Sequence, residues 1–229
     1  MPTVYDEEFG EITVRRSMRS RSIRISVAPN GTLRASLPPY APLFTLKRLI
    51  KSSRGKLRKM LEQQTPKYHF ENGMEIGKSH KLVVGKSIRT SIRRTGQSIV
   101  VALAPEDSLS DPAIERKIRD AIMVALRLEA KHYLPRRLEF IAEQYGYTYE
   151  NIRFSHASSR WGSCSSSGTI SLNIALMMLP HSLIDYVIIH ELCHTQQMNH
   201  SPKFWRLVEE ADPSYKLHRT MLKSHSPSV

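Results

Sequence analysis

Hydrophobic and polar residues alternate along much of the first hundred positions, and this alternation predicts β-strands with one buried face. Within residues 11–37 the pattern is clearest around Ile25, and Pro-Asn-Gly-Thr at 29–32 is typical of a hairpin turn. A second set of short hydrophobic runs, separated by glycines, covers residues 74–103. Both ranges are predicted to form strands.

A different spacing, with hydrophobic residues every three or four positions, predicts two helices. The first covers residues 43–64 and places many cations opposite its apolar face. The second is long: Asp111 is its candidate N-cap, Pro112 its candidate first residue, and Gly146 its candidate end. Pro135 is expected to kink or divide this second helix.

The last third of the chain combines short strands with further helices. Strands are predicted at 152–155 and 169–173, with residues 160–168 as the turn between them. One helix is predicted to start near Pro180 and another near Ser201.

These elements predict an α+β fold. A basic, β-rich N-terminal part is assigned to residues 1–105 and a helical core to residues 106–229. The two parts are expected to pack together as one compact unit.

Composition fits an ordinary globular protein, with 40% hydrophobic and 24% charged residues. No apolar run reaches the length that a membrane-spanning helix needs, and the acidic N-terminus has no apolar signal sequence. Cys164 and Cys193 have no metal-binding C-x-x-C spacing, and two lone thiols favour a reducing compartment. We therefore expect a cytoplasmic protein without a membrane partner.

The net charge of +13 is unevenly distributed. Residues 1–100 hold 20 Lys and Arg against 7 Asp and Glu, whereas residues 101–229 hold 14 of each. The excess favours a polyanionic partner for the N-terminal part. A basic surface that serves only solubility explains it equally well.

The most informative chemistry lies between residues 188 and 200. On a helix, His190 and His194 lie on one face with Glu191 beside them, and His200 follows six residues later. Two imidazoles can bind a metal ion, and the carboxylate can move protons. The preceding turns are strongly apolar, so this helix should be packed against the core. Buried polar groups on such a helix cost free energy unless they are compensated, and metal binding would compensate them.

The third metal ligand is open to more than one assignment. His200 has the spacing of the third metzincin histidine, but Gln197 stands where that motif has its turn glycine. We expect Asn199, which tolerates the left-handed conformation, to provide the turn instead. The downstream acids Glu209 and Glu210 are competing ligands; His200 is preferred from its chemistry.

Four motifs in the same order resemble the YgjP-like metallopeptidase domain, a family related to the WLM and SprT-like zinc peptidases. They are R160-W-G-S-C, S171-L-N, D185-Y-V-I-I-H-E-L-C-H and N199-H-S-P-K-F-W. The resemblance implies a minimal, gluzincin-like zinc peptidase core. It also implies that zinc binds the two helix histidines and His200.

The resulting hypothesis is a zinc-dependent hydrolase. Zn²⁺ on the three histidines would hold a water molecule, from which Glu191 removes a proton. Arg160 and Tyr215 are candidates for stabilising the oxyanion. A peptide or protein is the leading substrate. The alternatives are a metal-dependent nucleotide pyrophosphatase and a nucleic-acid-associated binding module or peptidase.

Overall fold

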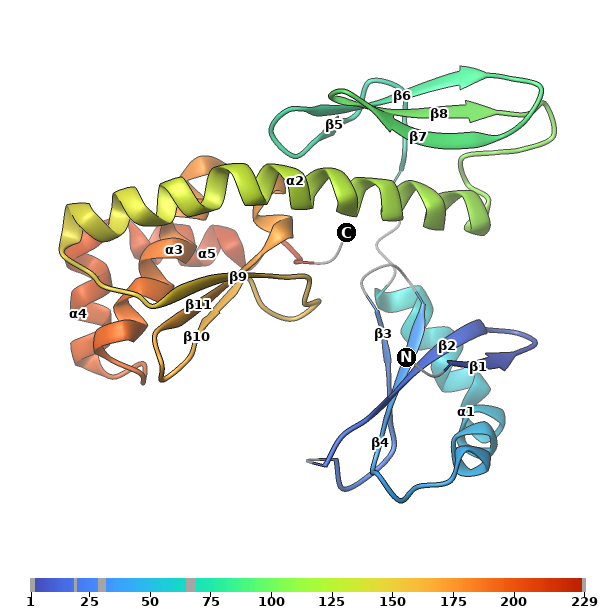
Figure 1. Cartoon of the computed structure of the whole chain (residues 1–229), viewed down its shortest axis with the longest axis horizontal. Helices are drawn as coiled ribbons and strands as arrows, with labels where there is room; N and C mark the ends of the chain where they lie inside the picture. Colours follow the sequence, from blue (N-terminus) through green and yellow to red (C-terminus); the bar gives the residue numbers. More distant parts are fainter. Residues whose placement is uncertain (1–2, 19, 29–31, 65–68, 228–229) are drawn as a thin grey trace. The chain divides into compact units, whose positions relative to one another are not determined.

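The structure is a computed structural model of the whole chain, and it describes residues 3–18, 20–28, 32–64 and 69–227. These residues form two compact units, Met1–Tyr68 and His69–Val229. The chain builds three small sheets and five α-helices in its described part, so the predicted α+β class is confirmed (Figure 1).

The first unit is a four-stranded sheet with one helix. Its strands are β1 (Thr3–Asp6), β2 (Gly10–Arg16), β3 (Arg24–Val27) and β4 (Leu33–Leu37), in the spatial order β1-β2-β4-β3. The helix α1 (Leu43–Gln64) covers one face, because Leu46, Ile50 and Leu57 join the buried residues of the strands in one core. β3 and β4 pair antiparallel as the hairpin prediction requires, whereas its turn residues 29–31 lie outside the described residues.

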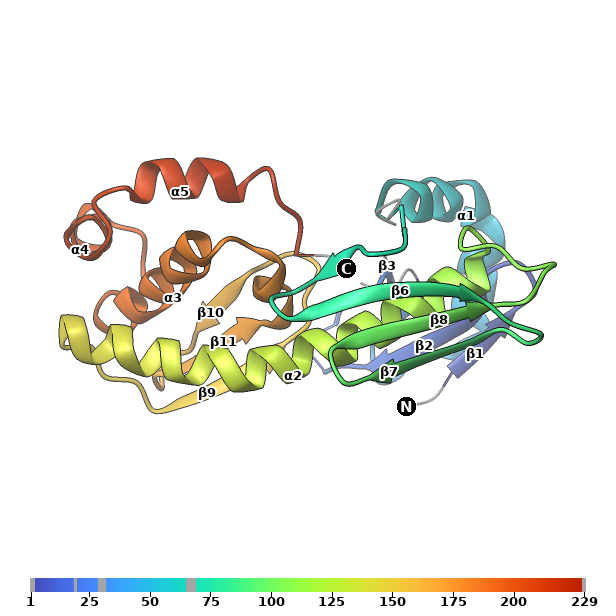
Figure 2. The ribbon, with the colours of Figure 1, turned by 90° about the horizontal axis from the view of Figure 1, so that it is seen from above.

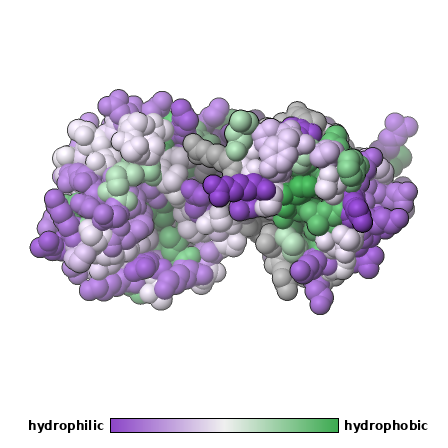
Figure 3. All heavy atoms as spheres, turned by 90° about the horizontal axis from the view of Figure 1, so that it is seen from below, coloured by the Kyte–Doolittle hydropathy of each residue, from purple (hydrophilic) through white to green (hydrophobic). Residues whose placement is uncertain are grey.

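The surface of the first unit is not uniformly polar. Figure 3 shows a hydrophobic patch on this unit, at the right of the view, among mostly hydrophilic side chains. The most exposed large hydrophobic side chains of the unit are Tyr5, Met18, Tyr40 and Phe44.

The second unit begins with another four-stranded sheet. Its strands are β5 (Glu75–Ile76), β6 (His80–Lys86), β7 (Ser91–Thr95) and β8 (Ser98–Leu103), in the order β5-β6-β8-β7. The pairing scheme repeats that of the first sheet: antiparallel, parallel, antiparallel. Each sheet is also followed by a helix, so the two segments share one topology.

The long helix α2 (Pro112–Tyr145) organises the second unit. Its first half lies along the β5–β8 sheet, and its second half packs against the C-terminal elements (Figure 2). It ends as predicted at Gly146, whose positive φ of 68° suits glycine and whose N–H bonds to the last carbonyls. Pro135 does not divide it, since buried Leu134 and Leu138 keep this stretch packed.

A buried carboxylate explains why residues 69–105 belong with the second unit. Glu129 of α2 accepts hydrogen bonds from the backbone of Lys78 and Ser79, at 2.6 and 2.9 Å, and from His80 Nδ1 at 2.6 Å. Gly77 is required beside it, because any Cβ there would overlap the carboxylate. Residues 69–105 therefore lie in the same compact unit as α2, the unit that spans His69–Val229.

The remaining elements position the site. A three-stranded sheet has the order β10-β11-β9, formed by β9 (Asn151–Ser155), β10 (Gly162–Cys164) and β11 (Thr169–Asn173). The 3₁₀ helix η1 (Ile174–Met178) leads to α3 (His181–Gln196), α4 (Pro202–Ala211) and α5 (Tyr215–Leu222).

Part of the predicted turn at 160–168 is in fact strand β10. Its three residues pair antiparallel with β11, and the turn shrinks to the residues between Cys164 and Thr169. No helix in the described ranges combines the length and the apolar character needed to cross a bilayer.

Candidate metal centre

Three histidine side chains meet at the C-terminal end of α3. His190 and His194 lie one turn apart on the helix, and His200 reaches them from the segment that follows it. Their candidate ligand nitrogens all lie within 4.8 Å of one another, and the Nε2 atoms of His190 and His200 are 3.1 Å apart. Two nitrogens on one tetrahedral zinc ion lie about 3.4 Å apart, so the arrangement fits such an ion.

The chain leaves α3 without a left-handed residue. Gln197 ends the helix in an extended conformation, with φ −140°, and no non-glycine residue among those described has a positive φ. The expectation that Asn199 adopts the left-handed conformation is therefore wrong. Its side-chain oxygen instead accepts hydrogen bonds from Gln197 Nε2 and from the Ser201 backbone, at 2.8 and 3.2 Å, which stabilises the turn.

The imidazoles are held in a form that can bind a metal. His194 Nδ1 lies 3.1 Å from the Gln197 carbonyl, which can only accept, so Nδ1 carries the proton and Nε2 is free. Burial is the main cause that lowers the pKa of His190 to about 3, and the charges of His194 and His200 contribute further. Burial also lowers the pKa of His194. Both imidazoles are thus neutral near pH 7, as a ligand must be.

Two aromatic residues from α4 fix the orientation of the three rings. Phe204 is fully buried, and its ring centroid lies 4.9, 4.4 and 4.8 Å from those of His190, His194 and His200. Trp205 stacks on His200 at 5.6 Å. No role was predicted for these two residues, although both belong to the N199-H-S-P-K-F-W motif and lie on the first turn of α4.

Glu191 is buried beside the histidines and faces strand β10. Its side chain is 5% exposed, and Oε2 has no hydrogen-bond partner among the described residues. Burial raises the pKa of Glu191 to about 8, against the lowering effect of Arg160 and of a backbone hydrogen bond from Cys164. A buried carboxyl group with a free oxygen and a pKa near neutrality suits proton transfer.

Gly162 allows this close approach of strand and helix. A Cβ atom at this position would lie 2.6 Å from both Cγ and Oε1 of Glu191. The sequence contained the signal, since Gly162 is the glycine of the R-W-G-S-C motif, but not the contact. Strand β10, the three histidines, Glu191 and Met198 together line a cleft of about 250 Å³.

The two predicted oxyanion residues lie in different surroundings. Arg160 is exposed, its charge acts on Glu191, and its carbonyl accepts a hydrogen bond from the buried Asn173 at 2.9 Å. Tyr215 is buried, and its ring stacks on that of Trp205 with the centroids 5.5 Å apart. Trp205 in turn stacks on His200, so Tyr215 contacts the histidine cluster only indirectly. Arg219, which the sequence did not single out, lies over Trp205 at 4.6 Å.

The competing acidic ligands lie outside the histidine cluster. Glu209 and Glu210 are exposed on α4, and Glu209 pairs with Lys216 at 3.4 Å. The group of potential ligands found among the described residues consists of His190, His194 and His200. This geometry favours His200 as the third ligand.

Comparison with known proteins shows the family of the chain and two solved structures that are similar to part of it. The profile of the YgjP-like metallopeptidase domain matches residues 21–225. Among solved structures, the metallopeptidase zymogen of Pyrococcus abyssi abylysin is 28% identical over 39% of this chain and 92% of its own, with a TM-score of 0.36. The zymogen of Methanocaldococcus jannaschii jannalysin is 21% identical over 40% and 96%, with a TM-score of 0.33.

A separate comparison with curated proteins found no match. The family profile nevertheless spans nearly the whole sequence, including every residue of the histidine cluster, Glu191 and Gly162. The chain belongs to the YgjP-like metallopeptidase domain family.

Proposed function

We propose that this chain is a zinc-dependent peptidase with Glu191 as its general base. The observation that carries the proposal is the meeting of three imidazoles with a buried carboxyl group at the edge of a β-sheet. Zn²⁺ bound by three protein ligands acts as a Lewis acid toward water and a carbonyl group. His190, His194 and His200 would hold the ion.

Glu191 would move the protons of the reaction. Its unpartnered Oε2 can take a proton from the attacking water and later give it to the nitrogen of the leaving amine. Its pKa of about 8 describes a carboxyl group with no cation at the histidines. A nearby positive charge favours the ionised form, so metal binding would prepare Glu191 to act as a base near pH 7.

Negative charge on the substrate carbonyl oxygen needs a partner as well. Arg160 is the better supported of the two predicted residues, because its charge already acts at Glu191. Tyr215 lies behind Trp205, and its assignment stays a prediction.

A peptide suits the cleft better than a nucleotide does. Strand β10 is an edge strand in its sheet, and it lines the cleft beside Glu191. An extended peptide can pair with such an edge through its backbone. The described residues that line the cleft include no Lys or Arg, so the lining offers no Lys or Arg side chain to bind the phosphates of a nucleotide.

One screen tests the substrate class. The chain is incubated with unstructured peptides and, separately, with nucleoside triphosphates, each with and without a metal chelator. We expect peptide cleavage that the chelator abolishes and no phosphate release. Chelator-sensitive phosphate release without peptide cleavage would support the pyrophosphatase instead. We also propose a cytoplasmic location, since Cys164 and Cys193 are both free thiols.

A specific feature of the first unit supports nucleic-acid contact as a second function. The sheet face opposite α1 carries three exposed arginines on three adjacent strands: Arg15, Arg24 and Arg34. Ser36 lies between Arg15 and Arg24 in the register, and Glu11 is the acid on this face. On the helix side, by contrast, Arg54 and Arg58 pair with acids of the β1–β2 turn.

Salt dependence separates this function from a merely solvated surface. Replacing the three face arginines by Gln should weaken binding of single-stranded nucleic acid and reduce its log–log salt slope by about 2, since each lost phosphate contact removes about 0.7. The matched control removes the same charge from the helix at Lys47, Lys56 and Lys59. Equal effects of the two variants would reject the arginine face.

A further inference from the structure

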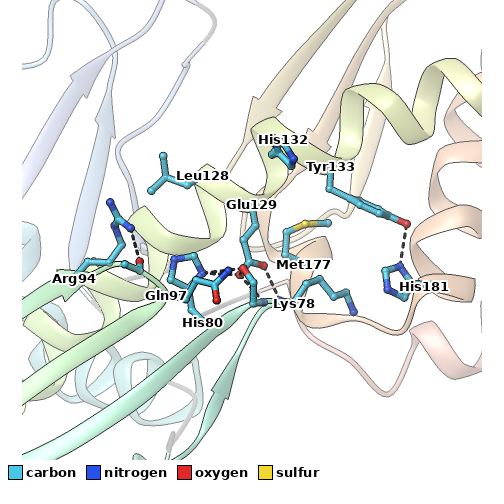
Figure 4. Close-up of a pocket in the computed structure, with 12 residues that line it drawn as sticks. Lys78, His80, Arg94, Gln97, Leu128, Glu129, His132, Tyr133, Met177 and His181 are labelled. Carbon is cyan, nitrogen blue, oxygen red and sulfur yellow. Dashed lines mark hydrogen bonds and ion pairs between the residues drawn. The ribbon is translucent and has the colours of Figure 1, made fainter.

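A second cavity in the His69–Val229 unit has its own chemistry. It encloses about 400 Å³ and is lined from the β5–β6 and β7–β8 turns, α2, η1 and the first residue of α3 (Figure 4). We call it the α2 pocket. It shares no lining residue with the histidine cleft, and its size is that of small-molecule sites.

The wall of the α2 pocket is rigid because Glu129 ties two elements together. The Glu129 oxygens accept hydrogen bonds from the backbone N–H groups of Lys78 and Ser79. They also accept hydrogen bonds from Ser79 Oγ at 2.8 Å and from His80 Nδ1 at 2.6 Å. Burial raises the pKa of Glu129, but hydrogen bonds from His80, Lys78 and Ser79 outweigh it, and the net pKa is lowered. The pocket is therefore preformed, with its one lining carboxylate already satisfied.

Basic side chains dominate the remaining polar lining. Lys78, His80, Arg94, His132 and His181 all border the cavity, against Glu129 as its acid. The Lys78 ammonium donates to the Leu179 carbonyl and keeps further N–H groups for a ligand. Burial lowers the pKa of Lys78, so this desolvated cation gains strongly from an anionic partner.

The start of α3 strengthens the positive potential at one end of the pocket. His181 is the first residue of this 16-residue helix, and no side chain caps the helix. Tyr133 Oη lies 2.9 Å from His181 Nδ1 and holds the imidazole in place. The positive end of the helix dipole and an oriented imidazole both favour an anion here.

Leu128 and Met177 give the lining an apolar part. Met177 is fully buried at the base, and Leu128 is 44% exposed along α2. Burying the exposed leucine under a hydrocarbon group is favourable. Basic side chains beside an apolar surface favour a ligand with one acidic group and an apolar body.

We propose that the α2 pocket binds a small organic anion, a carboxylate with a hydrocarbon chain. The carboxylate would face Lys78 and His181, and the chain would lie against Leu128 and Met177. This site is independent of the proposed hydrolysis.

Calorimetric titration with sodium octanoate, in the presence of a metal chelator, tests the proposal. The chelator removes any ion that could bind a carboxylate at the histidines. Octanoate should bind with one-to-one stoichiometry, and both octanol and acetate should bind at least about tenfold more weakly, because each lacks one half of the ligand. Octanol binding equal to octanoate binding, or no octanoate binding, would overturn the proposal.

Two exposed positions on α2 supply a matched pair of variants. Leu128→Glu adds to the pocket a negative charge, which repels the carboxylate of octanoate, and should weaken octanoate binding by about tenfold. Val124→Glu adds the same charge one turn earlier, at a 54% exposed residue outside the lining, and should leave binding unchanged. His190→Ala should also leave it unchanged. Equal effects of the two glutamates would show that octanoate binds elsewhere.

Discussion

Gly162→Ala tests the contact between strand β10 and the proposed general base. The added methyl carbon would lie 2.6 Å from Cγ and Oε1 of Glu191 and 2.8 Å from Cδ. Non-bonded carbons rest at about 3.5–4.0 Å, so the carboxyl group must withdraw by about 1 Å. The backbone itself is not strained, because Gly162 does not have a positive φ.

The displacement should affect catalysis more than metal binding or stability. A misplacement of about 1 Å at a reacting group lowers turnover by about 100-fold. Overpacking of this kind destabilises a fold by about 1–3 kcal/mol, which denaturant unfolding can measure. The three histidines keep their positions on other elements, so zinc content should stay at one ion per chain.

The assay compares kcat on a cleaved peptide with zinc content for wild type, Gly162→Ala and Gly85→Ala. Gly85 lies in β6, and a Cβ there meets nothing within 4 Å, so it controls for the loss of a glycine. Wild-type turnover by Gly162→Ala would refute the proposed role of Glu191 at this position. Loss of both zinc and activity would indicate instead that Gly162 is needed to position the metal ligands.

Two further variants test the third ligand and the Glu129 anchor. His200→Ala should weaken zinc binding by at least about 100-fold, whereas Glu209→Ala should not, and competition with a chromogenic chelator measures both; the reverse order would identify the glutamate as the ligand. Glu129→Gln should destabilise the second unit by about 2 kcal/mol at pH 7, measured by urea unfolding, because an NH2 group replaces one of the two oxygens that accept hydrogen bonds from buried donors. Since the folded-state pKa of Glu129 is lowered, its contribution to stability is present above the unfolded pKa and disappears as the pH falls through the lowered value, so the difference between wild type and variant should shrink as the pH falls below the unfolded pKa. A pH-independent difference would show that the carboxylate charge does not contribute.

Local sequence patterns were sufficient where one element determines the geometry. The placement of His190, Glu191 and His194 depends only on helical spacing, and α3 begins immediately after Pro180 as predicted. The same holds for α2, whose end at Gly146 follows from one glycine with a positive φ. The ranges predicted to form strands, 11–37 and 74–103, contain β2 to β4 and β5 to β8 almost completely, whereas β1 at Thr3–Asp6 was not predicted.

Contacts between distant elements could not be predicted from those patterns. Gly162 meets Glu191 only because β10 pairs as an edge strand and packs on α3. Nothing in the sequence around Glu129 indicates its partners, yet its carboxylate anchors residues about 50 positions earlier in the chain. Asn199 had the backbone tolerance for a left-handed turn, but its side chain stabilises the turn instead.

The most direct test of the proposed mechanism is Glu191→Gln. Glutamine keeps the size of the side chain but cannot take a proton from water at neutral pH. Zinc content and chelator-sensitive peptide cleavage are measured on the same preparation, beside wild type. We predict one zinc ion per chain in both proteins and no detectable cleavage by the variant. Zinc binding with cleavage at the wild-type rate would contradict the account.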